Sequence, residues 1–256
     1  MKKIIASVLL LLCLLIAGVL AWMSVPFAYQ KELTAAALHS DSEVQVQTSP
    51  WLSFTPAKGP ISDGIVFYPG GKTAPATFAP VMRQLAAEGH LVVIVPMPFN
   101  TAFLGIDKAN AVMAAYPDIE RWHLIGHSLG GVAAAEYAKK QPERLASLIF
   151  WASYPASDLQ AFSLPTLSVA GTLDSQTTPE KIAANAEKFP ARTQFIEMPA
   201  ANHWQYGYFA DSRNTEANLR SRQSQIDELL AHSLAFIRLQ APGAAGQQNE
   251  DNDNDA

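Results

Sequence analysis

The residues best suited to chemistry begin with a serine held between glycines. Residues 126–130 read Gly-His-Ser-Leu-Gly, which fits the G-x-S-x-G pattern with Ser128 as its central residue. An apolar run ends where the motif starts, and a helix-forming run follows at 131–135. This strand–turn–helix setting is what a nucleophile elbow requires, so Ser128 is the predicted nucleophile. The alternative is a phosphate-binding turn, which lacks here the Lys-Ser/Thr ending of a P-loop.

A nucleophilic serine needs a general base, and the base needs an acid that orients it. After such an elbow the chain order is serine, acid, histidine. Of the six histidines, four precede Ser128 and His232 lies in the last predicted helix, which leaves His203 as the base. Asp174 follows the preceding predicted strand and is the favoured acid. Asp158 is the rival, but its Ser-Asp-Leu setting is more typical of a helix N-cap.

Two backbone N–H groups are expected to hold the oxyanion. One belongs to Leu129, the residue after the serine. The other comes from residues 68–73, Tyr-Pro-Gly-Gly-Lys-Thr, with Gly71 as the first choice and Lys72 as the second. The Lys72 side chain either attracts a substrate carboxylate or is solvated. His127 is expected to point away from the serine and to fill space or hydrogen-bond within the elbow.

The elements that must position these residues alternate along the chain. Such alternation predicts an α/β fold with a mostly parallel sheet, right-handed crossovers and flanking helices. Only residues 152–165 separate two of the strands, which leaves no room for a large lid. Strands are predicted at 43–48, 51–55, 64–68, 91–95, 122–126, 148–151, 166–169 and 194–198, and helices at 78–87, 106–115, 131–140, 179–188 and 216–239.

Composition excludes several classes of protein. The 256 residues carry a formal net charge of -5 and contain no basic block, so nucleic-acid binding has no electrostatic footprint. The one cysteine, Cys13, lies in an apolar N-terminal run. A disulfide framework, a cysteine-based zinc site and a cysteine nucleophile in the rest of the chain are therefore excluded.

The N-terminal run, residues 4–23, is uncharged and follows Lys2 and Lys3. Its length matches a bilayer core of about 30 Å and exceeds the usual signal-peptide core of about 7 to 15 residues. An uncleaved anchor with an extracytoplasmic domain is predicted, and secretion after cleavage near residues 19–21 is the alternative. Without the two lysines the remainder carries -7, so the anchor is the expected membrane contact. The predicted organisation is anchor or signal segment 1–23, stalk 24–42, hydrolytic domain 43–240 and disordered acidic tail 241–256.

Together these residues resemble the α/β-hydrolase superfamily from about residue 64 to 203, and on to 239. The similarity is greatest to a small bacterial group of lidless hydrolases related to dienelactone hydrolases. That resemblance implies an eight-stranded sheet, a Ser–Asp–His triad and no metal or organic cofactor. Dienelactone hydrolases use a cysteine nucleophile where this chain has serine, which argues against lactone ring-opening of that kind. The matching segments are 68–71, 126–131, 151–155, 171–174 and 202–203.

The leading functional hypothesis is a serine hydrolase that cleaves a small carboxylic ester or thioester through an acyl-enzyme. An acyltransferase would use the same triad, and a non-catalytic, membrane-tethered binding protein would use the scaffold without the chemistry. Without a lid, long-chain lipase behaviour with interfacial activation is not expected. Four aromatic residues near strand ends are candidates for the substrate pocket or for core packing: Phe99, Trp151, Tyr154 and Trp204.

Overall fold

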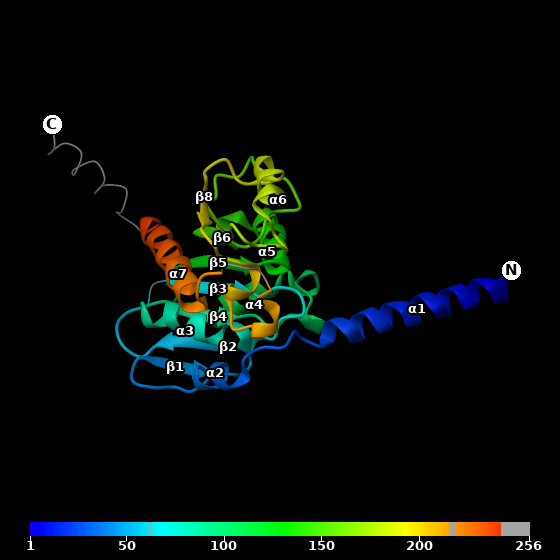
Figure 1. Ribbon diagram of the computed structural model, residues 1–256, viewed down its shortest axis with the longest axis horizontal. Helices are drawn as coiled ribbons and strands as arrows, with labels where there is room; N and C mark the ends of the chain where they lie inside the picture. Colours follow the sequence, from blue (N-terminus) through cyan, green and yellow to red (C-terminus); the bar gives the residue numbers. More distant parts are fainter. Residues whose placement is uncertain (62, 216–218, 242–256) are drawn as a thin grey trace.

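An eight-stranded sheet runs through the body of the computed structural model, which describes residues 1–61, 63–215 and 219–241 (Figure 1). Its strand order is β1-β2-β4-β3-β5-β6-β7-β8. The pairs β1–β2 and β2–β4 are antiparallel and all others are parallel, which confirms the predicted fold class. The strands are β1 (Val44–Gln47), β2 (Leu52–Pro56), β3 (Asp63–Tyr68), β4 (Leu91–Ile94), β5 (Arg121–His127), β6 (Ser147–Trp151), β7 (Thr166–Gly171) and β8 (Thr193–Met198).

Seven α-helices accompany the sheet in the described part of the chain. The helix predicted at 179–188 ends early and continues as a separate 3-10 turn, Ala186–Lys188. The last helix begins later than predicted, at Arg222, and the Ser221 side chain caps it. Residues 216–218 of the predicted helix lie outside the described part of the chain, as does the predicted tail from residue 242. The helices are α1 (Lys2–Ser24), α2 (Lys31–Ala36), α3 (Ala79–Ala87), α4 (Lys108–Ala115), α5 (Leu129–Lys140), α6 (Pro179–Ala183) and α7 (Arg222–Leu239).

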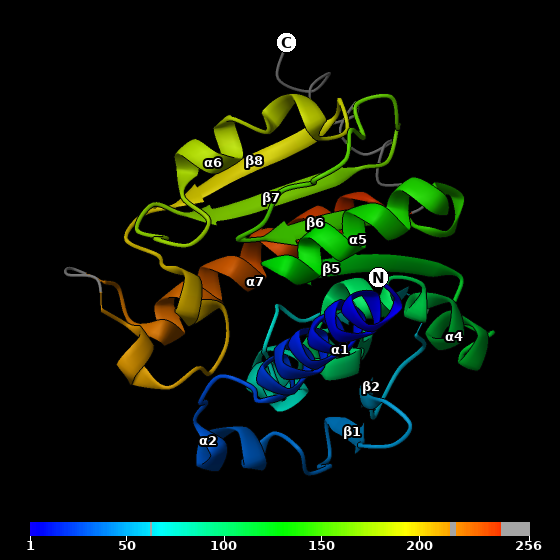
Figure 2. The ribbon, with the colours of Figure 1, turned by 90° about the vertical axis from the view of Figure 1, so that its right-hand side faces the viewer.

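The core lies in two layers, one on each face of the sheet. Alternate residues of β3 supply them, because successive strand side chains point to opposite faces. Ile65 and Phe67 pack with residues of α3 and α7, whereas Val66 and Tyr68 pack with residues of α4 and α5. Figure 2 shows α5 and α7 on opposite sides of β5 and β6. The central strands are therefore held rigidly from both sides, and their carboxyl ends can position a site.

Helix α1 stands apart from the sheet and projects away from the body (Figure 1). None of its residues is buried, and it is long and apolar enough to cross a membrane. A signal sequence near the N-terminus would have the same length and composition. The residues predicted as a stalk, 24–42, lie against the body instead. Phe27 packs on the core, Thr34 and Ala37 are buried, and the backbone N–H of Gln30 bonds a body carbonyl.

Candidate active site

The serine motif forms a sharp turn between β5 and α5. Ser128 has φ 53° and ψ −127°, a conformation that costs a non-glycine residue about 1–3 kcal/mol. Glycine is required on both sides of it. A Cβ on Gly126 would lie 2.4 Å from the Cα of Gly131, and one on Gly130 would lie 2.0 Å from a β3 carbonyl oxygen. The backbone of Ser128 is fixed further, because its carbonyl accepts a 2.7 Å hydrogen bond from the hydroxyl of Ser153.

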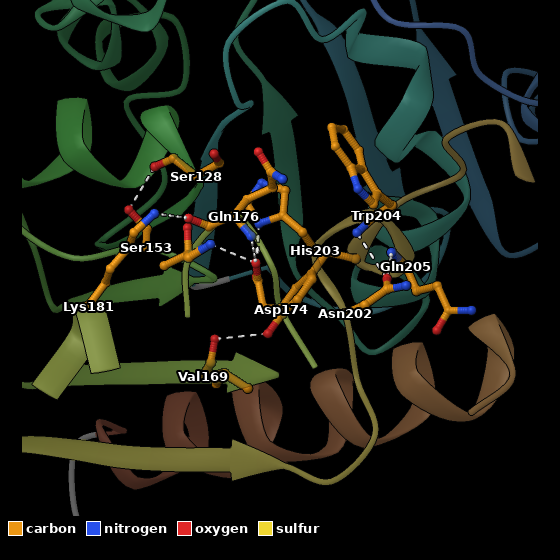
Figure 3. Close-up of polar contacts among 12 residues, drawn as sticks. Ser128, Ser153, Val169, Asp174, Gln176, Lys181, Asn202, His203, Trp204 and Gln205 are labelled. Atoms are coloured by element: carbon orange, nitrogen blue, oxygen red, sulfur yellow. Dashed lines mark hydrogen bonds and ion pairs between the residues drawn. The ribbon is translucent and has the colours of Figure 1, made fainter. Parts of the chain in front are cut away.

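Asp174 and His203 meet beside this turn (Figure 3). The Nδ1 atom of His203 lies 2.8 Å from Oδ2 of Asp174, and both side chains are buried. The other carboxylate oxygen, Oδ1, accepts the backbone N–H groups of Gln176 at 2.8 Å and Thr177 at 2.6 Å. Three hydrogen bonds thus fix the carboxylate, and the histidine's Nε2 is the ring nitrogen left for a reaction.

The loop that carries His203 is anchored by two amide side chains. The Oδ1 atom of Asn202 accepts the N–H groups of Trp204 and Gln205, which starts the 3-10 turn His203–Tyr206 (η6). Gln225 of α7 exchanges hydrogen bonds of 2.9 and 2.8 Å with the Asn202 backbone. No motif in the sequence points to Gln225, because only the fold brings α7 against this loop.

The predicted nucleophile, base and oxyanion donors all line one pocket of about 290 Å³. Ser128 and His203 both line it, although they come from loops far apart in the chain. Gly71 and Leu129 line it too, and a Cβ on Gly71 would lie 2.7 Å from the Leu129 side chain. Leu129 is the first residue of α5, where backbone N–H groups have no helical acceptor. The pocket therefore brings together the predicted nucleophile, base and first-choice oxyanion donors.

Comparison with known proteins agrees with this geometry. A family model described as an alpha/beta hydrolase family matches residues 64–227. The chain belongs to the alpha/beta hydrolase family. No curated protein sequence matches the chain.

Two solved structures are similar to this chain in fold. Est2, a thermophilic esterase from the planctomycete Thermogutta terrifontis, is 19% identical with a TM-score of 0.53 over 78% of this chain and 94% of that one. MGS-MChE2, an alpha/beta hydrolase enzyme from a sediment metagenome of the Mar Chica lagoon in Morocco, is 17% identical with a TM-score of 0.52 over 64% of this chain and 91% of that one. At these identities the likeness shows the fold alone.

The structure corrects the second-choice oxyanion donor of this hydrolase. The backbone N–H of Lys72 donates to the carbonyl of Asn100 at 2.9 Å, so it is not free to hold an oxyanion. The Lys72 side chain is buried rather than solvated. Its Nζ donates to the carbonyl of Trp22 and lies 3.8 Å from the centre of the Trp22 ring.

Only Trp204 of the four predicted aromatic residues lines the pocket. Trp151 is wholly buried in the core, where its Nε1 donates to Ser233. Tyr154 packs against the opposite core layer, and Phe99 is half exposed outside the pocket. The sequence missed the following lining residues, which come from predicted anchor, stalk and loop segments: Trp22, Met23, Phe27, Thr73, Gln176 and Phe209.

His127 and Asp158, the two other polar residues considered from the sequence, have structural rather than catalytic surroundings. The ring of His127 packs 4.7 Å from that of His203 and 5.2 Å from that of Phe78. Burial, together with the neighbouring His203, holds the pKa of His127 well below 6.5, so its ring is neutral. Asp158 starts a tight turn rather than capping a helix: its exposed carboxylate accepts the N–H of Gln160. Within the described residues, no three His, Cys, Asp or Glu side chains gather as metal ligands would.

Proposed function

We propose that this protein is a serine hydrolase that cleaves a carboxylic ester or thioester with Ser128, His203 and Asp174 as its triad. One observation carries the proposal: Ser128, on its strained turn, and His203, which is hydrogen-bonded to Asp174, line the same pocket. A pocket of about 290 Å³ is near the lower end of ligand sites, which run from about 300 to 1,000 Å³. Its size favours a short acyl group.

The reaction would follow the usual two steps of acyl transfer. The Ser128 hydroxyl attacks the ester carbonyl carbon while Nε2 of His203 takes its proton. The carbonyl oxygen becomes an oxyanion, which the N–H groups of Gly71 and Leu129 stabilise. When the intermediate collapses, the leaving alcohol or thiol takes the proton from His203. Water, activated by the same histidine, then releases the acid from Ser128.

Asp174 has a separate role in this scheme. Its carboxylate accepts the Nδ1 proton of His203, which fixes the tautomer with a free Nε2 and stabilises the imidazolium that forms. The low pKa of the nearby His127 means that this second imidazole adds no competing positive charge.

Labelling with a fluorophosphonate and hydrolysis of p-nitrophenyl esters of increasing acyl length test the proposal on the full chain in detergent. Ser128→Ala should abolish labelling and reduce turnover by about a million-fold. Ser153→Ala is the matched control, because Ser153 lies beside the turn and should still leave Ser128 labelled. Labelling of Ser128→Ala at the rate of the unaltered protein would show that the nucleophile lies elsewhere.

A further inference from the structure

The last turn of α1 forms part of the pocket wall. Trp22 and Met23 line the pocket together with Ser128 and His203, and Phe27 follows from the next segment. The strand-to-strand segment 152–165 contains no helix that could cover the site. The projecting helix thus ends against the pocket that Ser128 and His203 line.

Side chains from the body hold this end of α1 in place. The Lys72 ammonium group donates to the carbonyl of Trp22, and Nδ2 of Asn100 donates to the carbonyls of Ser24 at 2.9 Å and Met23 at 3.3 Å. The final carbonyls of a helix have no helical donors, so these bonds satisfy groups that would otherwise need water. The end of α1 is therefore docked on the body, and the body has a fixed position relative to the helix.

An exposed apolar patch lies next to the docked end. We define the foot patch as Val25, Phe99, Phe103 and Leu104, whose side chains are 64%, 51%, 45% and 52% exposed. Phe99 belongs to the 3-10 turn Pro98–Asn100 (η2), which contacts α1, and Phe103 and Leu104 belong to the next turn, Ala102–Gly105 (η3). Figure 1 shows this part of the chain at the base of α1.

Two residues in and beside the foot patch have an unfavourable, left-handed backbone conformation. Phe99 has φ 51°, which is unusual for a bulky residue, and Asn100 has φ 49°. This pair of left-handed residues leaves the Phe99 ring half exposed while Asn100 bonds the end of α1. Contact between water and the four apolar side chains of the foot patch is unfavourable, so an apolar environment is the partner that fits them.

We propose that the foot patch rests on the lipid surface from which α1 emerges, so that the pocket takes an amphipathic ester presented at that surface. The substrate part of this inference rests on the proposed hydrolase function. The 23 residues of α1 span about 34 Å, enough for a bilayer core of about 30 Å. Trp22 then lies at headgroup depth, where tryptophan is enriched. The body surface around the helix exit must meet the bilayer, and here that surface is apolar.

Charge and volume further define the partner and the substrate. Without Lys2 and Lys3 the chain carries -7, so contact with zwitterionic lipid through apolar side chains is favoured over contact with anionic headgroups. A pocket of about 290 Å³ holds a short acyl group, and the apolar remainder of the ester stays in the bilayer. The carbonyl reaches Ser128 past the end of α1 without a lid.

Fluorescence quenching tests where the foot patch lies. In a Cys13→Ser background, which removes the one native cysteine, single Phe103→Cys, Leu104→Cys and Leu239→Cys variants are labelled with an environment-sensitive dye. Leu239 is the control, because it is 45% exposed at the end of α7. In phosphatidylcholine vesicles, shallow spin-labelled lipids should quench the dyes at 103 and 104 and leave the dye at 239 bright. Equal quenching at all three positions would overturn the proposal.

Kinetics test the substrate part separately. The Phe103→Ser/Leu104→Ser variant should lose roughly fivefold or more in hydrolysis of hexadecyl propionate held in vesicles, with unchanged hydrolysis of dissolved p-nitrophenyl propionate. Phe195→Ser/Leu239→Ser, of matched residue types and 48% and 45% exposed, should change neither rate. An unchanged ratio of the two rates in the first variant would overturn the inference. Failure of the unaltered protein to hydrolyse either ester would overturn the proposed function, while the quenching result would still decide the lipid contact.

Discussion

Replacing Asp174 with asparagine should inactivate the enzyme without unfolding it, and the hydrogen bonds around the carboxylate explain why. Its Oδ1 atom accepts two backbone N–H groups, and Oδ2 faces the Nδ1 atom of His203. An amide has only one oxygen. That oxygen will stay with the two backbone donors, because leaving the buried N–H group of Thr177 unpaired would alone cost about 1–3 kcal/mol. The NH₂ group must then face His203.

The consequence is a change of tautomer. With an NH₂ donor against it, Nδ1 of His203 becomes an acceptor, and the ring proton moves to Nε2. A protonated Nε2 cannot take the proton of the Ser128 hydroxyl. In a related triad the same exchange lowers turnover by about ten-thousand-fold, which corresponds to about 5.4 kcal/mol in the barrier. The two backbone bonds persist, so the melting temperature should change little.

The assay is kcat for a short p-nitrophenyl ester, with Asp158→Asn as the matched control. Asp158 is exposed and accepts one backbone N–H, a bond that asparagine can also make. Its replacement should leave kcat within about twofold of the unaltered enzyme, since surface changes of this kind usually alter energies by less than about 0.5 kcal/mol. Turnover of Asp174→Asn within tenfold of the unaltered enzyme, or an equal loss in Asp158→Asn, would refute this reasoning.

Three further outcomes follow from local geometry. Ser128→Gly should be as inactive as Ser128→Ala but about 1 kcal/mol more stable in urea unfolding, because glycine relieves the positive φ; equal stability would contradict it. Gly130→Ala should lower Tm by roughly 10 °C, since its Cβ would lie 2.0 Å from a backbone oxygen; an unchanged Tm would contradict that. Burial would raise the pKa of Asp63, but the neighbouring His123 ring and the Arg121 guanidinium group, which donates to both carboxylate oxygens, lower it to about 2. Because this folded pKa lies below the ordinary 3.8, its stabilisation is present above pH 4 and lost towards pH 2, so Asp63→Asn should lower Tm by about 3 °C at pH 7 and not at pH 2.

The sheet was predictable because its signals are local. Apolar, β-branched runs such as β4, Leu91–Ile94, predict strands buried on both faces, and their alternation with helices determines a parallel sheet. Helix boundaries were less accurate. The helix expected over 179–188 breaks after Ala183, and α7 starts at Arg222, after the capping residue Ser221, rather than at residue 216. The spacing of apolar residues does not predict the residue at which a cap or a turn ends the helical hydrogen bonds.

The contact between Asp174 and His203 was predictable, because it follows from the positions of these residues after strand ends. Asp174 and His203 follow β7 and β8 directly, so the order of the strands was enough to bring them together. The pocket wall was not predictable in the same way. Trp151 belongs to the core because its strand position faces α7, and Trp22 belongs to the pocket because a helix outside the sheet ends there. Neither contact leaves a periodic signal in the sequence.

The contact between Trp22 and Lys72 bears on whether the N-terminal helix is removed. Cleavage after Ala21 would make Trp22 the first residue and give it an α-ammonium group. Lys72 already places its ammonium on the Trp22 carbonyl and ring. Two positive charges about 5 Å apart at an effective dielectric constant of about 20 repel by about 3 kcal/mol, so cleavage would weaken this pocket wall. We therefore expect the bond between Ala21 and Trp22 to remain intact in the mature protein. Mass spectrometry that recovers a peptide spanning this bond checks the expectation, and a protein that begins at Trp22 would refute it.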